Sequence, residues 1–154
     1  ARRRRAAAAP AAAGLGGGGV AGGRPAPLGA KLALPDRPVV ALIGDGSAMY
    51  TIQGLWTAAR ENLQMVFVII NNYSYRILKQ RTNAMKGLAQ QADLYVGMEL
   101  DKPRIDFVSV ARGLGLTAHK SNTLSDFQDL LEAALKHDGP TLIDVEVDRS
   151  WKPV

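Results

Sequence analysis

Two short polar groups stand out because each directly follows an apolar run of strand length. Asp45 lies between Gly44 and Gly46 after the run PVVALI, and the pair Asn71 and Asn72 follows the run MVFVII. Gly, Asp and Asn are depleted in strands, so their position at the ends of both runs indicates a chemical role. Carboxylate and amide oxygens are good ligands for Mg²⁺. The spacing therefore predicts a metal site that uses Asp45 together with Asn72.

The glycines beside Asp45 indicate that a phosphate group also binds there. Gly44 and Gly46 allow a tight turn and a close approach of the backbone. The helix predicted after Gly46 directs its first free N–H groups, near Ser47 and Ala48, toward the same place. A carboxylate beside a phosphate repels it, and a divalent cation between the two removes the conflict. Because Mg²⁺ takes six oxygen ligands at about 2.1 Å, the pattern predicts a Mg²⁺ diphosphate site.

The elements that must position these residues follow from the hydrophobic pattern. Residues 38–43 and 65–70 are continuous apolar runs, as in parallel strands that are covered on both faces. Between them, residues 47–61 have apolar side chains near i, i+3, i+4, i+7 spacing, which predicts one helix whose buried side includes Leu55 and Trp56. Strand, helix and strand in this order form a βαβ unit.

The same alternation continues toward the C-terminus. Asp106 is a predicted cap for one helix, Ser125 and Gln128 form a predicted capping box for another, and residues 141–147 form a last strand. Residues 76–104 are less regular and are expected to form a helix and a long loop. The fold class is therefore α/β, an open and mostly parallel sheet with helices on both faces.

The N-terminal segment has a different composition. Of its first 30 residues, 27 are Ala, Gly, Arg or Pro, and none is aromatic or acidic. Such a segment buries too little apolar surface to offset its ordering entropy. We expect residues 1–17 to be a tail, either disordered or the product of a misread GC-rich reading frame, and residues 18–154 to form the domain.

Charge and composition exclude several function classes. The formal net charge is +5, but residues 36–154 carry 13 basic and 14 acidic side chains and are close to neutral. A nucleic-acid interface would need a basic face, so we expect no nucleic-acid partner. No apolar run reaches the ~18 residues that span a bilayer, so we expect no membrane partner. The chain has no cysteine, and we expect a cytoplasmic location.

The paired motif resembles the signature of thiamine diphosphate-dependent enzymes. Gly44, Asp45 and Gly46 are followed by 24 residues and then by Asn71 and Asn72, and the family motif has this length and ends in an Asn pair. The resemblance covers residues 18–147 and corresponds to the C-terminal diphosphate-binding domain, usually the last of three. It implies thiamine diphosphate and Mg²⁺ as cofactors.

The resemblance also implies roles for individual residues. The side chains of Asp45 and Asn72 and the main-chain carbonyl of Ser74 correspond to the Mg²⁺ ligands. Gly44, Gly46, Ser47 and Ala48 correspond to the turn and the N–H groups that hold the diphosphate, and Val20 to the apolar residue under the thiazolium ring. Ile77, Leu78 and Arg81 correspond to residues that line the substrate pocket, where Arg81 replaces an aromatic residue.

Within the family the chain looks closest to benzoylformate decarboxylase. The segments that carry this likeness are GSAMYTIQGLWTAAREN, FVIINNYSY and RIDF with the ARGLG that follows it. Acetolactate synthases share the motif but resemble the chain less in the helix after the glycine turn. The resemblance implies decarboxylation of a small 2-oxo acid.

Two alternatives to that decarboxylase stay open: an acetolactate synthase-like carboligase domain, and a non-catalytic cofactor-binding fragment. In the family the activating Glu lies on a pyrimidine-binding domain, usually of a neighbouring subunit. We therefore expect an N-terminally truncated fragment that is inactive alone, with that domain of a full-length subunit as its partner in a homo-oligomer.

Overall fold

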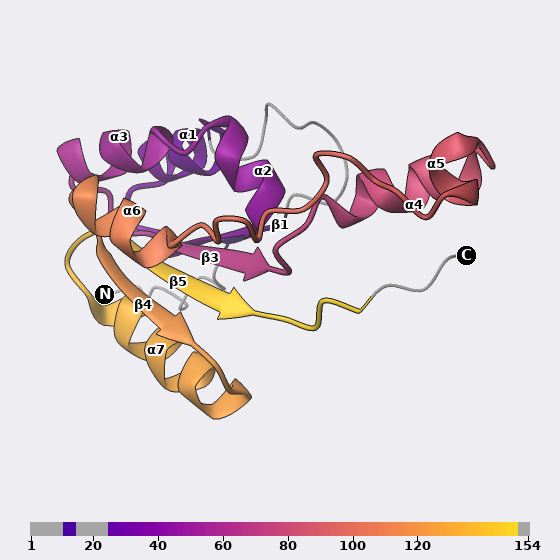
Figure 1. The fold of residues 1–154 in the computed structure, drawn as a ribbon. Helices are drawn as coiled ribbons and strands as arrows, with labels where there is room; N and C mark the ends of the chain where they lie inside the picture. Colours follow the sequence, from indigo (N-terminus) through magenta and orange to yellow (C-terminus); the bar gives the residue numbers. More distant parts are fainter. Residues whose placement is uncertain (1–10, 15–24, 151–154) are drawn as a thin grey trace, which may run out of the picture.

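The computed structural model describes residues 11–14 and 25–150 (Figure 1). The strands are β1 (Ala11–Gly14), β2 (Val39–Gly44), β3 (Val66–Asn71), β4 (Thr117–Ser121) and β5 (Thr141–Glu146). The helices are α1 (Pro25–Ala33), α2 (Asp45–Tyr50), α3 (Gly54–Arg60), α4 (Arg76–Ala84), α5 (Leu88–Gln91), α6 (Phe107–Gly113) and α7 (Leu124–Lys136).

The five strands form one parallel sheet in the order β1-β2-β3-β5-β4. Apolar residues fill β2 and β3 because both faces of the sheet are covered at these strands. Helices pack on both of its faces, and α4 and α5 extend away from it (Figure 1). The predicted fold class, an α/β protein with a parallel sheet, is confirmed.

The handedness of the crossovers explains which helix lies on which face. From β1 through β2 and β3 to β4 the chain moves across the sheet in one direction, and it then returns from β4 to β5. When crossovers are right-handed, a helix that connects strands in one direction across the sheet and a helix that connects them in the other direction lie on opposite faces. Accordingly, α1, α2, α3 and α6 share one face and α7 covers the other (Figure 1).

Two apolar layers hold these helices to the sheet. The larger layer joins Phe67 and Leu142 of the sheet to Leu55 of α3 and Phe107 of α6, all of which are fully buried. The smaller layer joins Val68 and its neighbours on the opposite face to α7. Since the layers lie on alternate residues of β3, its continuous apolar run is explained.

The helix predicted for residues 47–61 is divided in the structure, and this changes its buried face. α2 ends at Tyr50 and α3 begins at Gly54, with a turn between them. The break directs Leu55 and Ala58 toward the sheet, as predicted for Leu55. The prediction that Trp56 belongs to the core is wrong: its side chain is 52% exposed, and the Arg60 guanidinium lies 5.6 Å from its ring centroid.

The two predicted helix caps have different outcomes. Asp106 caps α6 as predicted, because its Oδ1 accepts a 2.9 Å hydrogen bond from the Ser109 N–H. The capping box at Ser125 is wrong. Thr123 caps α7 instead, and its hydroxyl accepts a 3.1 Å bond from the Asp126 N–H. Both residues are good caps, and the extended backbone of Thr123 gives it the required geometry.

The N-terminal segment contains one element that composition does not predict. Ala11–Gly14 forms β1, in register with Val39–Leu42 of β2. The division of the chain into a tail at residues 1–17 and a domain at residues 18–154 stays a prediction. Parallel pairing satisfies the backbone whatever the side chains are, and Ala and Gly do not prevent it. The rest of that predicted tail lies outside the described residues.

None of the described helices is long and apolar enough to cross a membrane. The cytoplasmic location stays a prediction.

Candidate functional site

The predicted polar residues meet at the carboxyl edge of the sheet. β2 and β3 are adjacent, with Gly44 opposite Ile70, so the residues that follow the two strands emerge side by side. Asp45 opens α2 directly after β2, and Asn72 follows the last residue of β3. Ligands of open α/β sheets bind outside this edge.

Asp45 is buried and holds two backbone N–H groups. The residue as a whole is 3% exposed. Oδ1 accepts a 2.9 Å bond from the Gly46 N–H, and Oδ2 accepts a 3.1 Å bond from the Ser74 N–H. Burial raises the pKa of the Asp45 carboxyl above its ordinary value, and the N–H bonds from Gly46 and Ser74 oppose that rise. A cation at the carboxylate would favour the ionised form.

Asn72 shares a donor with Asp45. Its Oδ1 accepts a 2.9 Å bond from the Ser74 N–H that also reaches Asp45 Oδ2. The two oxygens are therefore no more than about 6 Å apart. The structure thus brings together the three residues predicted as metal ligands: a carboxylate, an amide oxygen and the backbone of Ser74. This mixture of oxygen donors suits Mg²⁺.

Asn71 has a different role from its neighbour, which sequence reasoning missed. Its side chain is buried; Nδ2 donates to Asp144 Oδ1 at 3.1 Å and Oδ1 accepts from the Tyr73 N–H at 3.2 Å. Burial raises the pKa of Asp144, and the bond from Asn71 opposes that rise. Successive residues at a strand end point to opposite sides, so only one member of an Asn pair can face the same side as Asp45. That alternation is the signal that could have separated the two roles.

A cleft of about 260 Å³ opens beside these residues. Its lining consists of Gly44, Asp45, Gly46, Ser47, Asn72, Ser74, Tyr75, Arg76, Ile77 and Gln80. The lining includes the predicted site residues Ser47 and Ile77, whereas Ala48, Leu78 and Arg81 are not part of it. Ala48 is instead packed in the core. Arg76 and Gln80, in the first turns of α4, were not predicted; their i, i+4 spacing places them on one face of that helix.

Gly46 allows a side chain to approach the backbone closely. A Cβ at this position would lie 2.6 Å from Cδ1 and Cε1 of Tyr75. The ring of Tyr75 also makes an edge contact with Tyr50, with centroids 6.4 Å apart. Absence of a Cβ at residue 46 is thus required by the packing of Tyr75 against the glycine turn.

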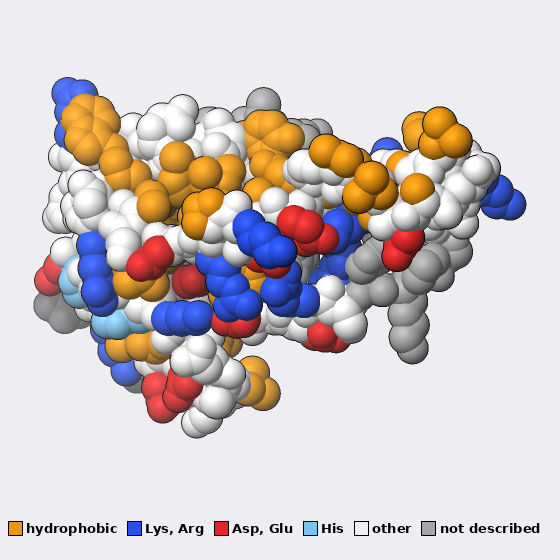
Figure 2. All heavy atoms as spheres, in the orientation of Figure 1, with side chains coloured by type: hydrophobic (Ala, Val, Ile, Leu, Met, Phe, Trp, Pro, Cys, Tyr) orange, Lys and Arg blue, Asp and Glu red, His pale blue; other side chains and the backbone are white. Residues whose placement is uncertain are grey.

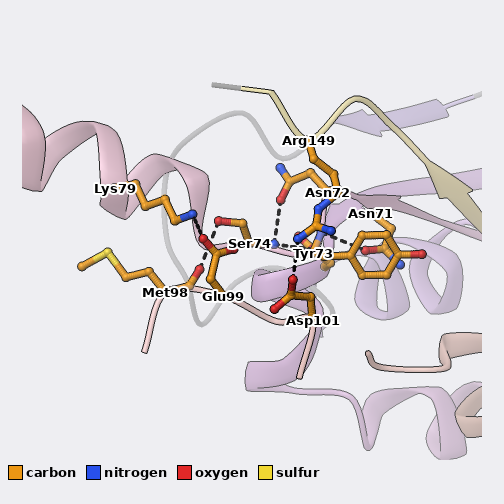
Figure 3. Close-up of polar contacts among 10 residues, drawn as sticks. Asn71, Asn72, Tyr73, Ser74, Lys79, Met98, Glu99, Asp101 and Arg149 are labelled. Atoms are coloured by element: carbon orange, nitrogen blue, oxygen red, sulfur yellow. Dashed lines mark hydrogen bonds and ion pairs between the residues drawn. The ribbon is translucent and has the colours of Figure 1, made fainter. Parts of the chain in front are cut away.

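The turn that carries Asn72 and Ser74 is fastened to residues 98–101 (Figure 3). The Ser74 hydroxyl and the Tyr75 N–H donate to the Met98 carbonyl at 3.0 and 2.9 Å, and the Leu100 N–H donates to the Tyr73 carbonyl at 2.8 Å. An ion pair between Lys79 of α4 and Glu99 adds to this attachment. The segment predicted as an irregular loop therefore supports the site.

One predicted contact lies outside the described residues. Val20, expected under the thiazolium ring, belongs to the part of the chain that the structure does not describe.

The fold and this site define the class of protein: an α/β domain whose cleft lies at the carboxyl edge of a parallel sheet, with an Asp and an Asn at adjacent strand ends. The family model described as "Thiamine pyrophosphate enzyme, C-terminal TPP binding domain" matches residues 4–145. The chain belongs to this family, as the paired motif predicted.

The relatives include proteins named as acetolactate synthases and proteins named as benzoylformate decarboxylases. The chain is 48% identical over 129 residues to a Mycobacterium tuberculosis protein provisionally named acetolactate synthase large subunit IlvX, covering 81% of this chain and 24% of that protein. It is 40% identical over 123 residues to benzoylformate decarboxylase of Pseudomonas aeruginosa, covering 80% and 22%.

A solved structure of a thiamine diphosphate-dependent enzyme has the same fold over most of this chain. The thiamine diphosphate-dependent 4-hydroxybenzoylformate decarboxylase of Rhodococcus jostii RHA1 superposes with a TM-score of 0.73 at 39% identity, over 83% of this chain and 23% of that one. The chain therefore spans about a quarter of the length of the proteins it matches.

Proposed function

We propose that this chain binds thiamine diphosphate through Mg²⁺ and serves as the C-terminal domain of a 2-oxo acid decarboxylase similar to benzoylformate decarboxylase. One observation carries the proposal: Asp45 and Asn72, from different strand ends, direct side-chain oxygens at the same N–H group beside the cleft. The family match makes thiamine diphosphate the ligand that this arrangement would serve.

The residues present fit the metal. Asp45 and Asn72 would bind Mg²⁺ through their side chains and Ser74 through its carbonyl, and two phosphate oxygens and a water would supply the other ligands. Asp45 supplies the one carboxylate of this set, so little negative charge is added beside a diphosphate. Mg²⁺ prefers such a site, made of one or two carboxylates together with substrate phosphates.

The cofactor's phosphates would lie in the cleft against the backbone of Gly44, Gly46 and Ser47. Arg76, which also lines the cleft, would add a positive charge near them. When bound, thiamine diphosphate supplies the electron sink for breaking a bond next to a carbonyl group. This chain's contribution is to hold and orient the diphosphate end of the cofactor. Ile77 would present an apolar surface to the substrate end of the cleft.

A carboligase of the acetolactate synthase type is the second candidate function. It is favoured by the 48% identity to the mycobacterial relative that carries this name. Both candidates act on 2-oxo acids and need the same cofactor. The residues that distinguish them would lie at the substrate, where this chain offers Ile77 and Gln80.

A partner domain is part of the proposal because apolar side chains on α2, on α4 and its C-cap, and on α5 are exposed. We call this the apolar surface, and its members are Met49, Tyr50, Ile77, Leu78, Met85 and Leu88. Figure 2 shows hydrophobic side chains along this side of the molecule. Exposed patches of this kind mark interaction sites. The pyrimidine-binding domain of a full-length subunit, in a homo-oligomer, would cover it.

The metal site is tested by calorimetric titration of thiamine diphosphate with and without Mg²⁺, in the wild-type chain and in Asp45→Asn. The substitution keeps the shape of the side chain and removes its charge. Loss of an outer-shell partner costs about 10–100-fold in metal affinity. Because Asp45 would be a direct ligand, we expect Asp45→Asn to lower the Mg²⁺-dependent affinity by more than this. Asp129→Ala, an exposed acid on α7 across the sheet, is the matched control and should bind like wild type.

Equal affinity in Asp45→Asn and wild type would refute the site. The same samples are then mixed with benzoylformate or pyruvate and assayed for carbon dioxide. We expect no turnover, since the activating Glu of the family lies on another domain. Turnover by the wild-type chain above the Asp45→Asn control would contradict the need for a partner.

A further inference from the structure

Tyr73, between the proposed ligands Asn72 and Ser74, has an uncommon backbone conformation. Its φ angle is +56°, in the left-handed region where non-glycine residues are infrequent. A bulky side chain in this region is maintained only where its surroundings fix it. The residue is also buried, at 4% exposed. A glycine would adopt this turn more easily, so the tyrosine side chain must contribute something that glycine lacks.

Two arginines from distant parts of the chain stack on the Tyr73 ring. The Arg104 guanidinium carbon lies 4.5 Å from the ring centroid and that of Arg149 lies 5.4 Å from it. Both distances are within the range of cation–π attraction. Arg149 also donates a 2.7 Å hydrogen bond to Asp101 Oδ2, which ties the same arginine to the segment beside the turn (Figure 3).

The Tyr73 hydroxyl is held from a third direction. It donates a 2.9 Å hydrogen bond to Glu146 Oε2 at the end of β5. Lys120 of β4 forms a 2.9 Å ion pair with the same Glu146 oxygen. The Lys120 bond, followed by the Tyr73 bond, holds the pKa of Glu146 below its ordinary value, so the acceptor is ionised at neutral pH. Hydrogen bonds to an ionised acceptor are stronger than neutral ones.

The backbone of Tyr73 is fixed at both ends as well. Its N–H donates to Asn71 Oδ1 at 3.2 Å, and its carbonyl accepts from the Leu100 N–H at 2.8 Å. The next N–H along the chain, that of Ser74, is the one shared by Asp45 and Asn72. Any rotation of the Tyr73 peptide groups therefore moves the ligand-bearing atoms on both sides of it.

We infer that Tyr73 is a positioning residue for the Mg²⁺ ligands, and that Arg104, Arg149 and Glu146 hold its side chain so that the left-handed turn presents Asn72 and Ser74 to the metal. The inference rests on the proposed function for the identity of the metal. The geometry of the turn itself does not depend on it. The anchoring side chains come from the loop before α6, from the residue at the end of β5 and from the segment after β5, so the ligand turn is set by contacts across the domain.

The test compares Tyr73→Gly with Tyr73→Phe in the 154-residue chain. Glycine removes the ring and the hydroxyl while it allows the positive φ; phenylalanine keeps the ring between the arginines and loses only the bond to Glu146. Lys86→Gly is the matched control, because Lys86 is an exposed residue with a φ of +52° in the turn after α4. It relieves the same kind of strain without contact with the site.

Two quantities are measured. The first is hydrogen exchange of the Ser74 and Leu100 amides in the absence of ligands, relative to the core amide of Val68. The second is Mg²⁺ affinity at saturating thiamine diphosphate. For Tyr73→Gly we expect exchange at least about tenfold faster at both amides and Mg²⁺ affinity about 10–100-fold weaker, the size of an outer-shell effect. Tyr73→Phe should fall between Tyr73→Gly and wild type, and Lys86→Gly should match wild type.

Either quantity unchanged in Tyr73→Gly overturns the inference, because glycine would then hold the turn or the ligands as well as tyrosine does. If Tyr73→Gly does not fold, the two quantities are compared between Tyr73→Phe and wild type. Exchange or Mg²⁺ affinity unchanged in Tyr73→Phe then overturns the inference. If wild type itself binds no Mg²⁺ with thiamine diphosphate, the proposed function fails. The exchange rates at Ser74 and Leu100 then decide whether Tyr73 fixes the turn.

Discussion

Gly46→Ala is the substitution for which the structure gives the most direct physical expectation. A methyl group at this position would lie 2.6 Å from two ring carbons of Tyr75, whereas carbon atoms pack at about 3.5–4.0 Å. Tyr75 must therefore move by about 1 Å at both atoms or rotate into the cleft that it lines. Gly44→Ala is the matched control, because its methyl group meets nothing within 4 Å and its φ of −68° suits alanine.

The magnitude follows from two opposed effects. Overpacking of this kind costs about 1–3 kcal/mol. Alanine is better than glycine inside a helix by about 0.5–1 kcal/mol, and residue 46 lies in α2. We expect Gly46→Ala to lower the free energy of unfolding by about 1–2 kcal/mol, and its melting temperature by about 2–8 °C for a chain of this size. Gly44→Ala should stay within about 0.5 kcal/mol of wild type.

A double-mutant cycle assigns the effect to the Tyr75 contact. Gly46→Ala is measured in the wild-type chain and in Tyr75→Ala by urea unfolding without ligands. If the clash causes the loss, Gly46→Ala should cost little once the ring is absent, which gives a coupling energy of at least about 1 kcal/mol. Equal losses in the two backgrounds, or a loss in Gly44→Ala as large as in Gly46→Ala, would refute the reasoning.

Two further predictions concern stability. Gly113→Ala in α6 should raise the free energy of unfolding by up to about 1 kcal/mol, because alanine is the better helix former. Gly115→Ala should lower it by about 1–3 kcal/mol, because Gly115 has a φ of +91°. Thermal unfolding checks both, and a change of the same sign in both variants would contradict the backbone argument. The pKa of Glu146 is held low by its bonds from Lys120 and Tyr73, so its ionised form stabilises the fold above the unfolded pKa of about 4.3, and this stability is lost as pH falls through the lower folded pKa. Glu146→Gln should therefore flatten the acid limb of stability against pH, measured by urea unfolding from pH 7 to pH 3, and an unchanged acid limb would contradict this.

The sheet could be predicted because its strands carry strong local signals. The runs before Gly44 and Asn71 are continuous and apolar, and the structure ends β2 and β3 at these residues. The split between α2 and α3 could not be predicted in the same way. Periodicity in residues 47–61 fits one helix or two, and the turn at 51–53 changes which side chains are buried. Trp56 was assigned to the wrong face for that reason.

The residues proposed as metal ligands were more predictable than the side chains that hold the turn between them. Asp45 and Asn72 follow from local motifs, since strand ends determine where they emerge. The partners of Asn71 and Tyr73 lie about 73 positions away in β5, in Asp144 and Glu146. No sequence pattern links residues at that separation without a register for the sheet. The register of β3 against β5, which pairs Asn71 with Glu146, supplies the link.

The cleft and the apolar surface share a residue, and this connects cofactor binding to assembly. Ile77 lines the cleft beside Asp45 and is also 58% exposed on α4. On the proposed function, a partner domain that covers the apolar surface must also lie against the open side of the cleft. Excluding water there would strengthen the attraction between Mg²⁺ and the buried Asp45 carboxylate, because charges interact more strongly at lower dielectric constant. The isolated domain should therefore bind Mg²⁺ through its carboxylate and amide more weakly than the assembled enzyme does.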